Sequence, residues 1–146
     1  MIRLMRDNMV TTNGVGLSPD QNTVYAAETL TSRLWAFDLA APGAFATDER
    51  GAPRAHVLGP LPGLQMLDSL AVEADGNVAV GTLINGGITV FSPTGDVEHL
   101  PFPDSMITNI CFGGADMRDA WITASATGKL FKCRWPRPGL ALNFNA

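Results

Sequence analysis

One stretch of this chain occurs three times with variations, and its central copy reads Leu67-Asp68-Ser69-Leu70-Ala71-Val72-Glu73-Ala74-Asp75-Gly76. In this copy an acidic residue precedes an alternating apolar segment, which ends in an Asp-Gly turn. Residues 12–20 and 108–116 repeat that order, with Asn13 and Asn109 at the place of Asp68. The three anchors lie 55 and then 41 residues apart. This spacing is typical of the units of roughly 40–50 residues that form the blades of a β-propeller.

The overall composition predicts one folded all-β domain. The 146 residues are 46% hydrophobic and 16% charged, which provides enough apolar material for a sizeable core. Fifteen glycines and ten prolines are spread along the chain and divide it into many short segments. Short segments between frequent turns favour strands over helices.

The charge pattern argues against some classes of partner. The formal net charge is −4 and the pI is near 4.9, whereas a surface that binds nucleic acid needs clustered cations. We interpret the cations near the C-terminal end as a solvated strand face because their spacing alternates: Lys129, Lys132, Arg134 and Arg137. No apolar run approaches the roughly 20 residues of a membrane helix, and residues 1–6 do not resemble a signal peptide. We therefore expect a cytoplasmic protein with no nucleic-acid and no membrane partner.

The strand pattern predicts a single domain of three propeller blades over residues 1–146. The blade units cover residues 12–60, 67–102 and 108–136, and residues 40–53 form a loop that lengthens the first unit. The expected strands are 14–17, 23–27, 34–39 and 55–58, then 70–73, 77–83, 87–91 and 97–100, then 110–112, 120–124 and 129–135. Pro136 and Pro138 argue against a fourth strand in the third unit.

Residues 2–6 alternate like a strand but precede the first unit. We interpret this segment as the outermost strand of a blade, paired either within the chain or with a second chain, since propellers avoid exposed edges. Three blades are fewer than the four to eight that normally close a ring. Cys111 and Cys133 fall on the first and third strands of one blade, beyond disulfide reach, and are expected to be buried or half-buried thiols.

The three repeated stretches, together with Thr23-Val24-Tyr25-Ala26-Ala27 and Leu34-Trp35-Ala36-Phe37-Asp38, resemble the six-bladed propellers of the senescence marker protein (regucalcin)/gluconolactonase-like family. The resemblance covers almost the whole chain. Full-length members of that family are about twice as long, and this chain resembles their C-terminal half, blades four to six. The implied fold is therefore all-β, half of a six-bladed propeller made of three four-stranded antiparallel blades.

The resemblance also implies an activity, which is metal-dependent hydrolysis of a sugar lactone or similar cyclic ester. The family holds one divalent cation with four ligands, two of which match Asn13 and Asp68. Their oxygen atoms suit Ca²⁺ above all, with Mg²⁺ or Zn²⁺ as alternatives. Asp68 is the implied general base as well as a ligand, and Asn109 is a third candidate ligand because it stands at the repeated position. The family's other ligands and its substrate-binding Arg lie in the half that this chain does not match.

These residues also have purely structural interpretations. Asn13 and Asn109 suit turns, and Asp68 could cap backbone amides. The chain departs from the family at Leu67-Asp68-Ser69, where Pro-Asp-Gly is common, so the backbone there is expected to be less free. We expect Glu28 to be solvated and His56 and His99 to lie on outer strands, away from any central site. The aromatic residues of the strands are expected to pack between blades: Trp35, Phe37, Phe91, Trp121, Phe131 and Trp135.

Two copies of the chain would supply six blades, and residues 2–6 of each would complete the third blade of the other. A homodimer of this kind predicts a lactone-binding enzyme whose central tunnel is lined twice by Asn13, Asp68 and Asn109. Two alternatives remain at this point. The chain is a non-catalytic binding or interaction module, or it is a truncated relative whose activity depends on a partner that carries the other blades.

Overall fold

The computed structural model describes residues 2–61 and 63–142, and every regular element within them is a β-strand. The first sheet contains β1 (Thr12–Leu17), β2 (Thr23–Glu28), β3 (Arg33–Ala41), β4 (Ala44–Phe45) and β5 (Ala55–Val57). The second contains β6 (Met66–Val72), β7 (Val78–Leu83), β8 (Gly87–Phe91) and β9 (Val97–Pro101). The third contains β10 (Ile107–Gly113), β11 (Asp119–Ala124) and β12 (Lys129–Arg134). The predicted all-β fold class is confirmed. The described part of the chain holds no helix that would traverse a bilayer.

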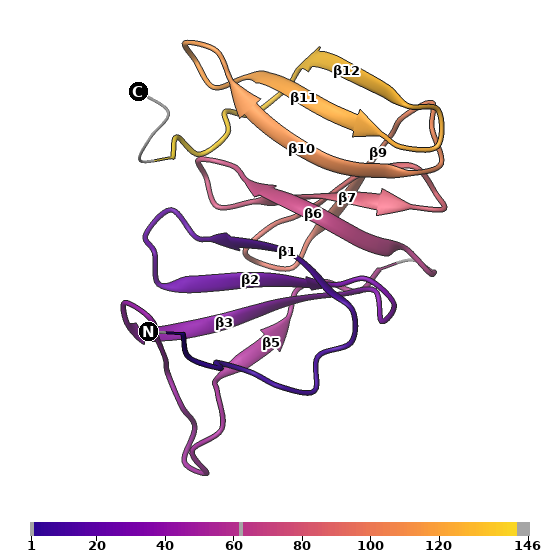
Figure 1. Cartoon of the computed structure of the whole chain (residues 1–146). Helices are drawn as coiled ribbons and strands as arrows, with labels where there is room; N and C mark the ends of the chain where they lie inside the picture. Colours follow the sequence, from indigo (N-terminus) through magenta and orange to yellow (C-terminus); the bar gives the residue numbers. More distant parts are fainter. Residues whose placement is uncertain (1, 62, 143–146) are drawn as a thin grey trace.

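The three sheets stack face to face in the order of the chain (Figure 1). Each begins with an inner strand, and the three inner strands β1, β6 and β10 lie side by side because β6 contacts both of the others. Within each sheet the following strands pair antiparallel in sequence order, as hairpins do. The arrangement is that of consecutive propeller blades around a shared axis.

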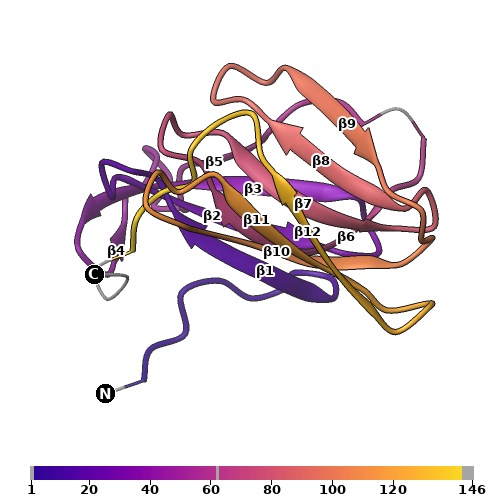
Figure 2. The same ribbon diagram turned by 90° about the horizontal axis from the view of Figure 1, so that it is seen from above.

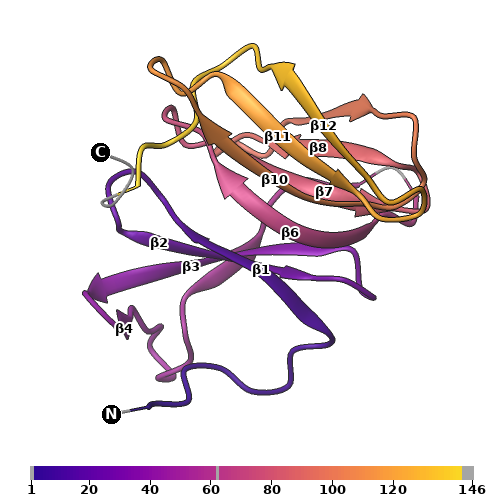
Figure 3. The same ribbon diagram turned by 45° about the horizontal axis from the view of Figure 1, so that its top comes forward.

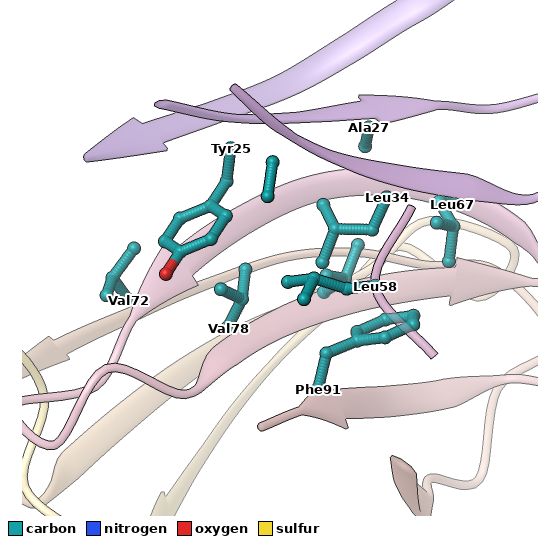
Figure 4. Close-up of a cluster of buried hydrophobic side chains, with 10 residues drawn as sticks. Tyr25, Ala27, Leu34, Leu58, Leu67, Val72, Val78 and Phe91 are labelled. Atoms are coloured by element: carbon teal, nitrogen blue, oxygen red, sulfur yellow. The ribbon is translucent and has the colours of Figure 1, made fainter. Parts of the chain in front are cut away.

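Two apolar layers hold the stack together. The first lies between the first two sheets and contains Tyr25 and Leu34 from one side with Leu67, Val78 and Phe91 from the other (Figure 4). The second lies between the second and third sheets and is built around Ile88, Ile107, Ile110, Ile122 and Trp135. The second sheet contributes to both layers because successive residues of its strands point to opposite faces. It is the middle blade of the three.

The segment 40–53 is not the simple loop that the sequence predicts. β3 continues to Ala41, turns at Gly43 with a φ of 72°, and pairs back through β4. The ring of Phe45 stacks on Phe37 with centroids 4.9 Å apart, and this contact stabilises the hairpin of β3 and β4. An alanine-rich segment with a single aromatic residue gives no clear strand periodicity, so its sequence did not reveal the hairpin.

Residues 2–6 form no strand in the single chain. The alternative in which this segment completes a blade within its own chain is therefore wrong. The segment runs outside the sheets, where Figure 2 shows it as an indigo trace. The third sheet has three strands among the described residues, and β12 forms its edge. Residues 2–6 would need a neighbouring strand edge to form a stable strand. The edge at β12 is out of their reach, because it lies at the other end of the stack from β1.

The chain after β12 crosses back to the second sheet instead of forming a fourth strand. We call residues 135–140 the C-terminal clasp. Its backbone bonds to the end of β6 and the turn that follows, through Leu140 N–H to Val72 C=O at 2.9 Å and Ala74 N–H to Pro138 C=O at 2.9 Å. Figure 3 shows the clasp as a yellow segment passing from β12 toward the turn between β1 and β2. The clasp therefore links the third sheet to the second.

Glu73 holds the C-terminal clasp through two of its residues, Trp135 and Arg137. Its carboxylate is fully buried and accepts hydrogen bonds from Trp135 Nε1 at 2.6 Å and from Asn77 Nδ2 at 2.9 Å. The guanidinium of Arg137 pairs with the same carboxylate and with Glu98. A buried carboxylate requires such partners, since an unpaired one is costly.

The two cysteines are free, as expected from their places on β10 and β12. Cys133 is half-buried, and burial raises the pKa of its thiol. The prediction that Cys111 is buried or half-buried is wrong, because this residue is exposed on the face of the third sheet that points away from the second. That face has no neighbouring blade within the chain.

Candidate functional site

The three inner strands begin at the same edge of the molecule. In each sheet the start of the inner strand lies opposite the end of the second strand, and a bridge between Leu83 and Met106 joins the second and third sheets there. We call this the site edge and define it by the connecting segments 8–11, 29–32, 58–61, 63–65, 84–86, 102–106 and 125–128. The opposite edge, which we call the far edge, contains the turns 18–22, 74–77, 92–96 and 114–118.

Each inner strand carries a β-bulge close to the site edge. The pairing register shifts between Thr12 and Val15, between Leu67 and Leu70, and between Ile107 and Asn109. A bulge inserts an extra residue into one strand and re-aims the side chains at that point. The predicted ligands thus lie inside the inner strands, at or beside a bulge, and not before them as the sequence pattern indicated.

The structure brings Asn13 and Asp68 together. The hydroxyl oxygen of Ser69 lies 3.4 Å from Asn13 Oδ1 and 3.4 Å from Asp68 Oδ1. The backbone N–H of Ser69 donates to Asp68 Oδ1 at 2.8 Å. Asn13 is exposed and Asp68 half-buried, so both side-chain oxygens face accessible space at the site edge. The two predicted ligands therefore converge on one point, from neighbouring blades.

Ser69 takes the place where the family resemblance implies a glycine. It is not one of the residues with a positive φ, so the backbone conformation at this position does not require glycine. Its hydroxyl instead connects the two oxygen-bearing side chains. The departure from the family pattern is compatible with the geometry of the site.

Gly14 allows the first two blades to approach closely enough for this convergence. A Cβ atom at this position would lie 2.8 Å from the carbonyl oxygen of Asp68 and 2.8 Å from the backbone nitrogen of Leu70. Real Cβ atoms do not approach backbone atoms so closely. Because Gly14 directly follows Asn13, the glycine places the Asn13 side chain beside β6.

Asn109 lies on β10, one inner strand further along the stack. Its Oδ1 accepts the backbone N–H of Ile110 at 2.9 Å, as Asp68 Oδ1 accepts that of Ser69. Asn109 is exposed, and Thr123 is its partner in register on β11. Its role as a third ligand stays a prediction.

The donor set fits a hard divalent cation in kind but not in number. Amide and carboxylate oxygens are the ligands that Ca²⁺ and Mg²⁺ take, whereas Zn²⁺ favours nitrogen and sulfur. Within residues 2–61 and 63–142 no group of three or more His, Cys, Asp and Glu side chains gathers where it would hold a metal. Asn13 and Asp68 thus provide two oxygens of a site that needs about six.

Glu28 is a further carboxylate at the site edge, and the expectation that it is solvated is wrong. It is buried at the end of β2, where its carboxylate accepts Val10 N–H at 2.8 Å and the Thr31 hydroxyl at 2.6 Å. Burial alone raises the pKa of Glu28, and the hydrogen bonds from Thr31 and Val10 outweigh that effect and lower it. Glu28 therefore ties the segment before β1 to the turn after β2.

The role of Glu73, which lies at the far edge, could not be predicted from the sequence.

His56 on β5 is exposed, and His99 on β9 is half-buried. Among the four cations that we expected on a solvated face, three are paired with carboxylates: Lys132 with Asp119, Arg134 with Asp116 and Asp119, and Arg137 with Glu73. Hydrogen bonds from Arg134 hold the pKa of Asp116 below its ordinary range, and hydrogen bonds from Lys132 and Arg134 do the same for the pKa of Asp119.

The family model described as the SMP-30/gluconolactonase/LRE-like region matches residues 1–126. The chain belongs to this family. Another protein of similar sequence is a 6-deoxy-6-sulfogluconolactonase from Pseudomonas putida, which is 26% identical over 140 residues. The match covers 94% of this chain and 46% of that protein. The chain therefore spans less than half the length of this SMP-30/gluconolactonase-like relative.

Solved structures of similar fold are β-propellers that belong to gluconolactonase-like proteins. A gluconolactonase from Xanthomonas campestris has a TM-score of 0.73 at 23% identity, over 92% of this chain and 40% of its own. A calcium-binding regucalcin from Agrobacterium tumefaciens has a TM-score of 0.66 at 21% identity, over 90% of this chain and 50% of its own. At this level of identity the likeness concerns the fold alone. It confirms that the described chain is a partial β-propeller of the SMP-30/gluconolactonase type.

Proposed function

We propose that this chain supplies part of a divalent-metal-dependent lactonase site, and that it hydrolyses a sugar lactone or a similar cyclic ester once the ring of blades is complete. The observation that carries the proposal is the convergence of Asn13 Oδ1 and Asp68 Oδ1 on one point of the site edge. The lactonase relative supports the class of substrate. Ca²⁺ is the proposed ion because the regucalcin of similar fold is described as calcium-binding and both donors are oxygens.

Hydrolysis of a lactone needs a base for the attacking water and a positioned carbonyl. In the proposed reaction the oxygen of water bonds to the carbonyl carbon, the carboxylate of Asp68 accepts the water proton, and the ring C–O bond breaks to give a hydroxy acid. The departing alkoxide takes up a proton, so the reaction consumes one water. When bound between Asn13 and Asp68, the cation would supply Lewis-acid polarisation of the carbonyl. The hydroxyl and backbone N–H of Ser69 hold Asp68 in place.

The remaining blades are proposed to come from a second copy of the chain. The first sheet leaves Val15 and Leu17 of β1 exposed, and the third leaves Trp121 and Leu130 exposed, so both ends of the stack present apolar side chains. In a propeller each such face packs against the next blade. A two-fold dimer would cover all four faces and bring a second Asn13 and Asp68 to the central axis.

The test is a pair of variants in a purified, assembled sample. Asp68→Asn removes the base and one anionic ligand, and we expect it to abolish lactone hydrolysis and to weaken Ca²⁺ binding in calorimetry. Asp75→Asn makes the same change in the far-edge turn of the same blade and should leave both unchanged. Failure of the unmodified protein to bind any ion from a panel of divalent cations would overturn the proposal.

The alternative function is a non-catalytic binding or interaction module. The observation in its favour is the number of ligands, because the described chain provides only two oxygens at the point of convergence. A module of this kind would assemble without hydrolysing any lactone. Turnover that disappears in Asp68→Asn and persists in Asp75→Asn rules this alternative out.

A further inference from the structure

The two edges of the stack differ in their exposed apolar residues. Five large apolar side chains of the site edge are between 41% and 60% exposed, namely Val10, Leu30, Leu64, Ile84 and Met106. The four turns of the far edge contain no exposed large apolar residue; they consist mainly of Asp, Asn, Ser, Pro and Gly. Single exposed apolar residues need no explanation, but their collection on one edge does.

Backbone contacts at the site edge bring some of the segments that carry these apolar residues next to each other. Val10 and Leu30 lie on adjacent segments, because the backbone N–H of Thr29 donates to the carbonyl of Thr11 at 3.0 Å. Ile84 and Met106 lie on adjacent segments, because Leu83 and Met106 form a β-bridge between the second and third sheets. Leu64 precedes β6, the strand that carries Asp68. The oxygens of Asn13 and Asp68 thus lie on an edge with apolar side chains from all three blades.

Ile84 shows an unfavourable local conformation in addition to its exposure. It has a φ of 76°, a left-handed conformation that a β-branched residue adopts only at a cost. The cost is not offset by burial, since the side chain is 58% exposed. Glycine or asparagine would fit this turn with less strain.

We propose that the site edge selects lactones that carry an apolar substituent, such as an alkyl or aryl group. The inference rests on the proposed lactonase function and names its substrate class. The cyclic ester lies at Asn13 and Asp68, while the substituent lies on Leu64 and on one of the two apolar pairs. Covering these exposed side chains removes apolar surface from water, which provides binding free energy that a polyhydroxylated sugar lactone does not gain.

Two exposed cations at the site edge offer an alternative basis for substrate recognition, because they would favour anionic lactones over apolar ones. Arg33 begins β3 and Lys129 begins β12, and both lie outside the apolar pairs. If they governed recognition, an anionic sugar lactone would be the better substrate. The number and arrangement of the apolar residues favour the apolar class.

The experiment compares three kinds of lactone with the assembled protein: δ-gluconolactone, an anionic sugar lactone, and δ-lactones whose alkyl substituent grows from methyl to hexyl. We expect kcat/KM to rise about two- to fourfold for each added methylene over the first few, as partial to full burial of a CH₂ group predicts. The double variant Leu64→Ser/Ile84→Asn should flatten this rise, so that kcat/KM no longer depends on the length of the alkyl substituent. Val57→Thr changes an exposed apolar residue of β5 and is the matched control, for which the rise should persist.

The outcomes separate this inference from the function on which it rests. Hydrolysis of none of the lactones would overturn the proposed function itself. Hydrolysis that is independent of chain length, or best with the anionic sugar lactone, would overturn the apolar selection and leave the lactonase function standing. A third outcome is that the protein binds phosphatidylcholine vesicles, that the double variant abolishes this binding, and that the chain-length series does not change. This outcome would also overturn the apolar selection, and it would assign the site edge to a lipid surface.

Discussion

At the scale of single residues, Asp68 with Asn13 forms one group of polar side chains, and Glu28 with Glu73 forms another. Asp68 lies beside Asn13 at an accessible point, whereas Glu28 and Glu73 are buried and hold segments together. The repeat predicts the first group, because its members occupy equivalent places in each blade. It does not predict the second, because Glu73 meets Trp135 across 62 residues, a pairing that no local pattern contains. Position within a repeat thus identified candidate ligands, while anchoring roles depended on tertiary contacts.

A prediction at this scale concerns His99. Burial lowers the pKa of its imidazole, and Thr89 Oγ1 lies 2.9 Å from its Nδ1. The unfolded chain keeps the ordinary value of about 6.5, so below that pH the unfolded state takes up a proton that the folded state resists. We expect the free energy of unfolding to fall as the pH decreases from about 7.5 through about 6.5 toward the lower pKa of the folded state.

Urea denaturation at a series of pH values measures this effect. His99→Gln should flatten the decline, whereas His56→Gln, at the exposed histidine of β5, should retain it. A wild-type stability that does not change between pH 7.5 and pH 5.5 would contradict the role of His99.

At the scale of elements, hairpins with local turn signals were predicted and elements that depend on remote partners were not. The turn at Asp75-Gly76 joins β6 to β7 as expected, since Gly76 has a φ of 93°. The β3–β4 arm was missed because the stacking of Phe45 on Phe37 stabilises it. The C-terminal clasp was missed because its hydrogen-bond partners lie on β6 and at Glu73.

The contact between β1 and β6 gives a prediction at this scale. Gly14→Ala places a Cβ atom against backbone atoms of Asp68 and Leu70, so the two inner strands must separate. We expect a loss of about 1–3 kcal/mol of unfolding free energy, together with weaker cation binding. Gly113→Ala on β10 is the control, because a Cβ atom there meets nothing within 4 Å. Equal stability of the two variants in urea denaturation would refute the close approach.

The C-terminal clasp gives a second prediction. Glu73→Ala leaves Arg137 and the indole N–H of Trp135 without their buried partner, and we expect a loss of about 3–5 kcal/mol in denaturant unfolding. Glu98→Ala removes only the exposed partner of Arg137 and should cost less than about 1 kcal/mol. A similar loss in both variants would mean that Glu73 does not anchor the clasp.

At the scale of the whole molecule, the described chain is a partial ring with an open face at each end. The sequence predicted the number of blades because each repeat contains its own hairpins. It could not determine how the ring is completed, because the faces of Val15 and Trp121 are exposed and no blade among the described residues covers them. The same limit applies to the candidate site, of which the chain provides two converging oxygens.

The proposed dimer predicts coupled changes in mass and in the reactivity of Cys111. Sedimentation should show a species of twice the chain mass of 15.5 kDa. In a Cys133→Ser background, the exposed Cys111 should react more slowly with a thiol reagent as the concentration rises and the dimer forms, since its sheet face becomes covered. Trp121→Asp on the same face should keep the protein monomeric and Cys111 reactive. A dimer in which Cys111 reacts at the monomer rate would use a different interface.

The open edge of β12 has a consequence for solubility. An unpaired strand accepts any complementary edge, and contacts that repeat without closing a ring produce filaments instead of dimers. Lys129, Lys132 and Arg134 lie along this strand, and their long charged side chains, two of them paired with carboxylates, must be desolvated before another edge can pair with β12. These cations therefore discourage indiscriminate edge pairing. Their replacement by neutral residues would favour fibrous aggregates at concentrations where the unmodified protein stays in solution.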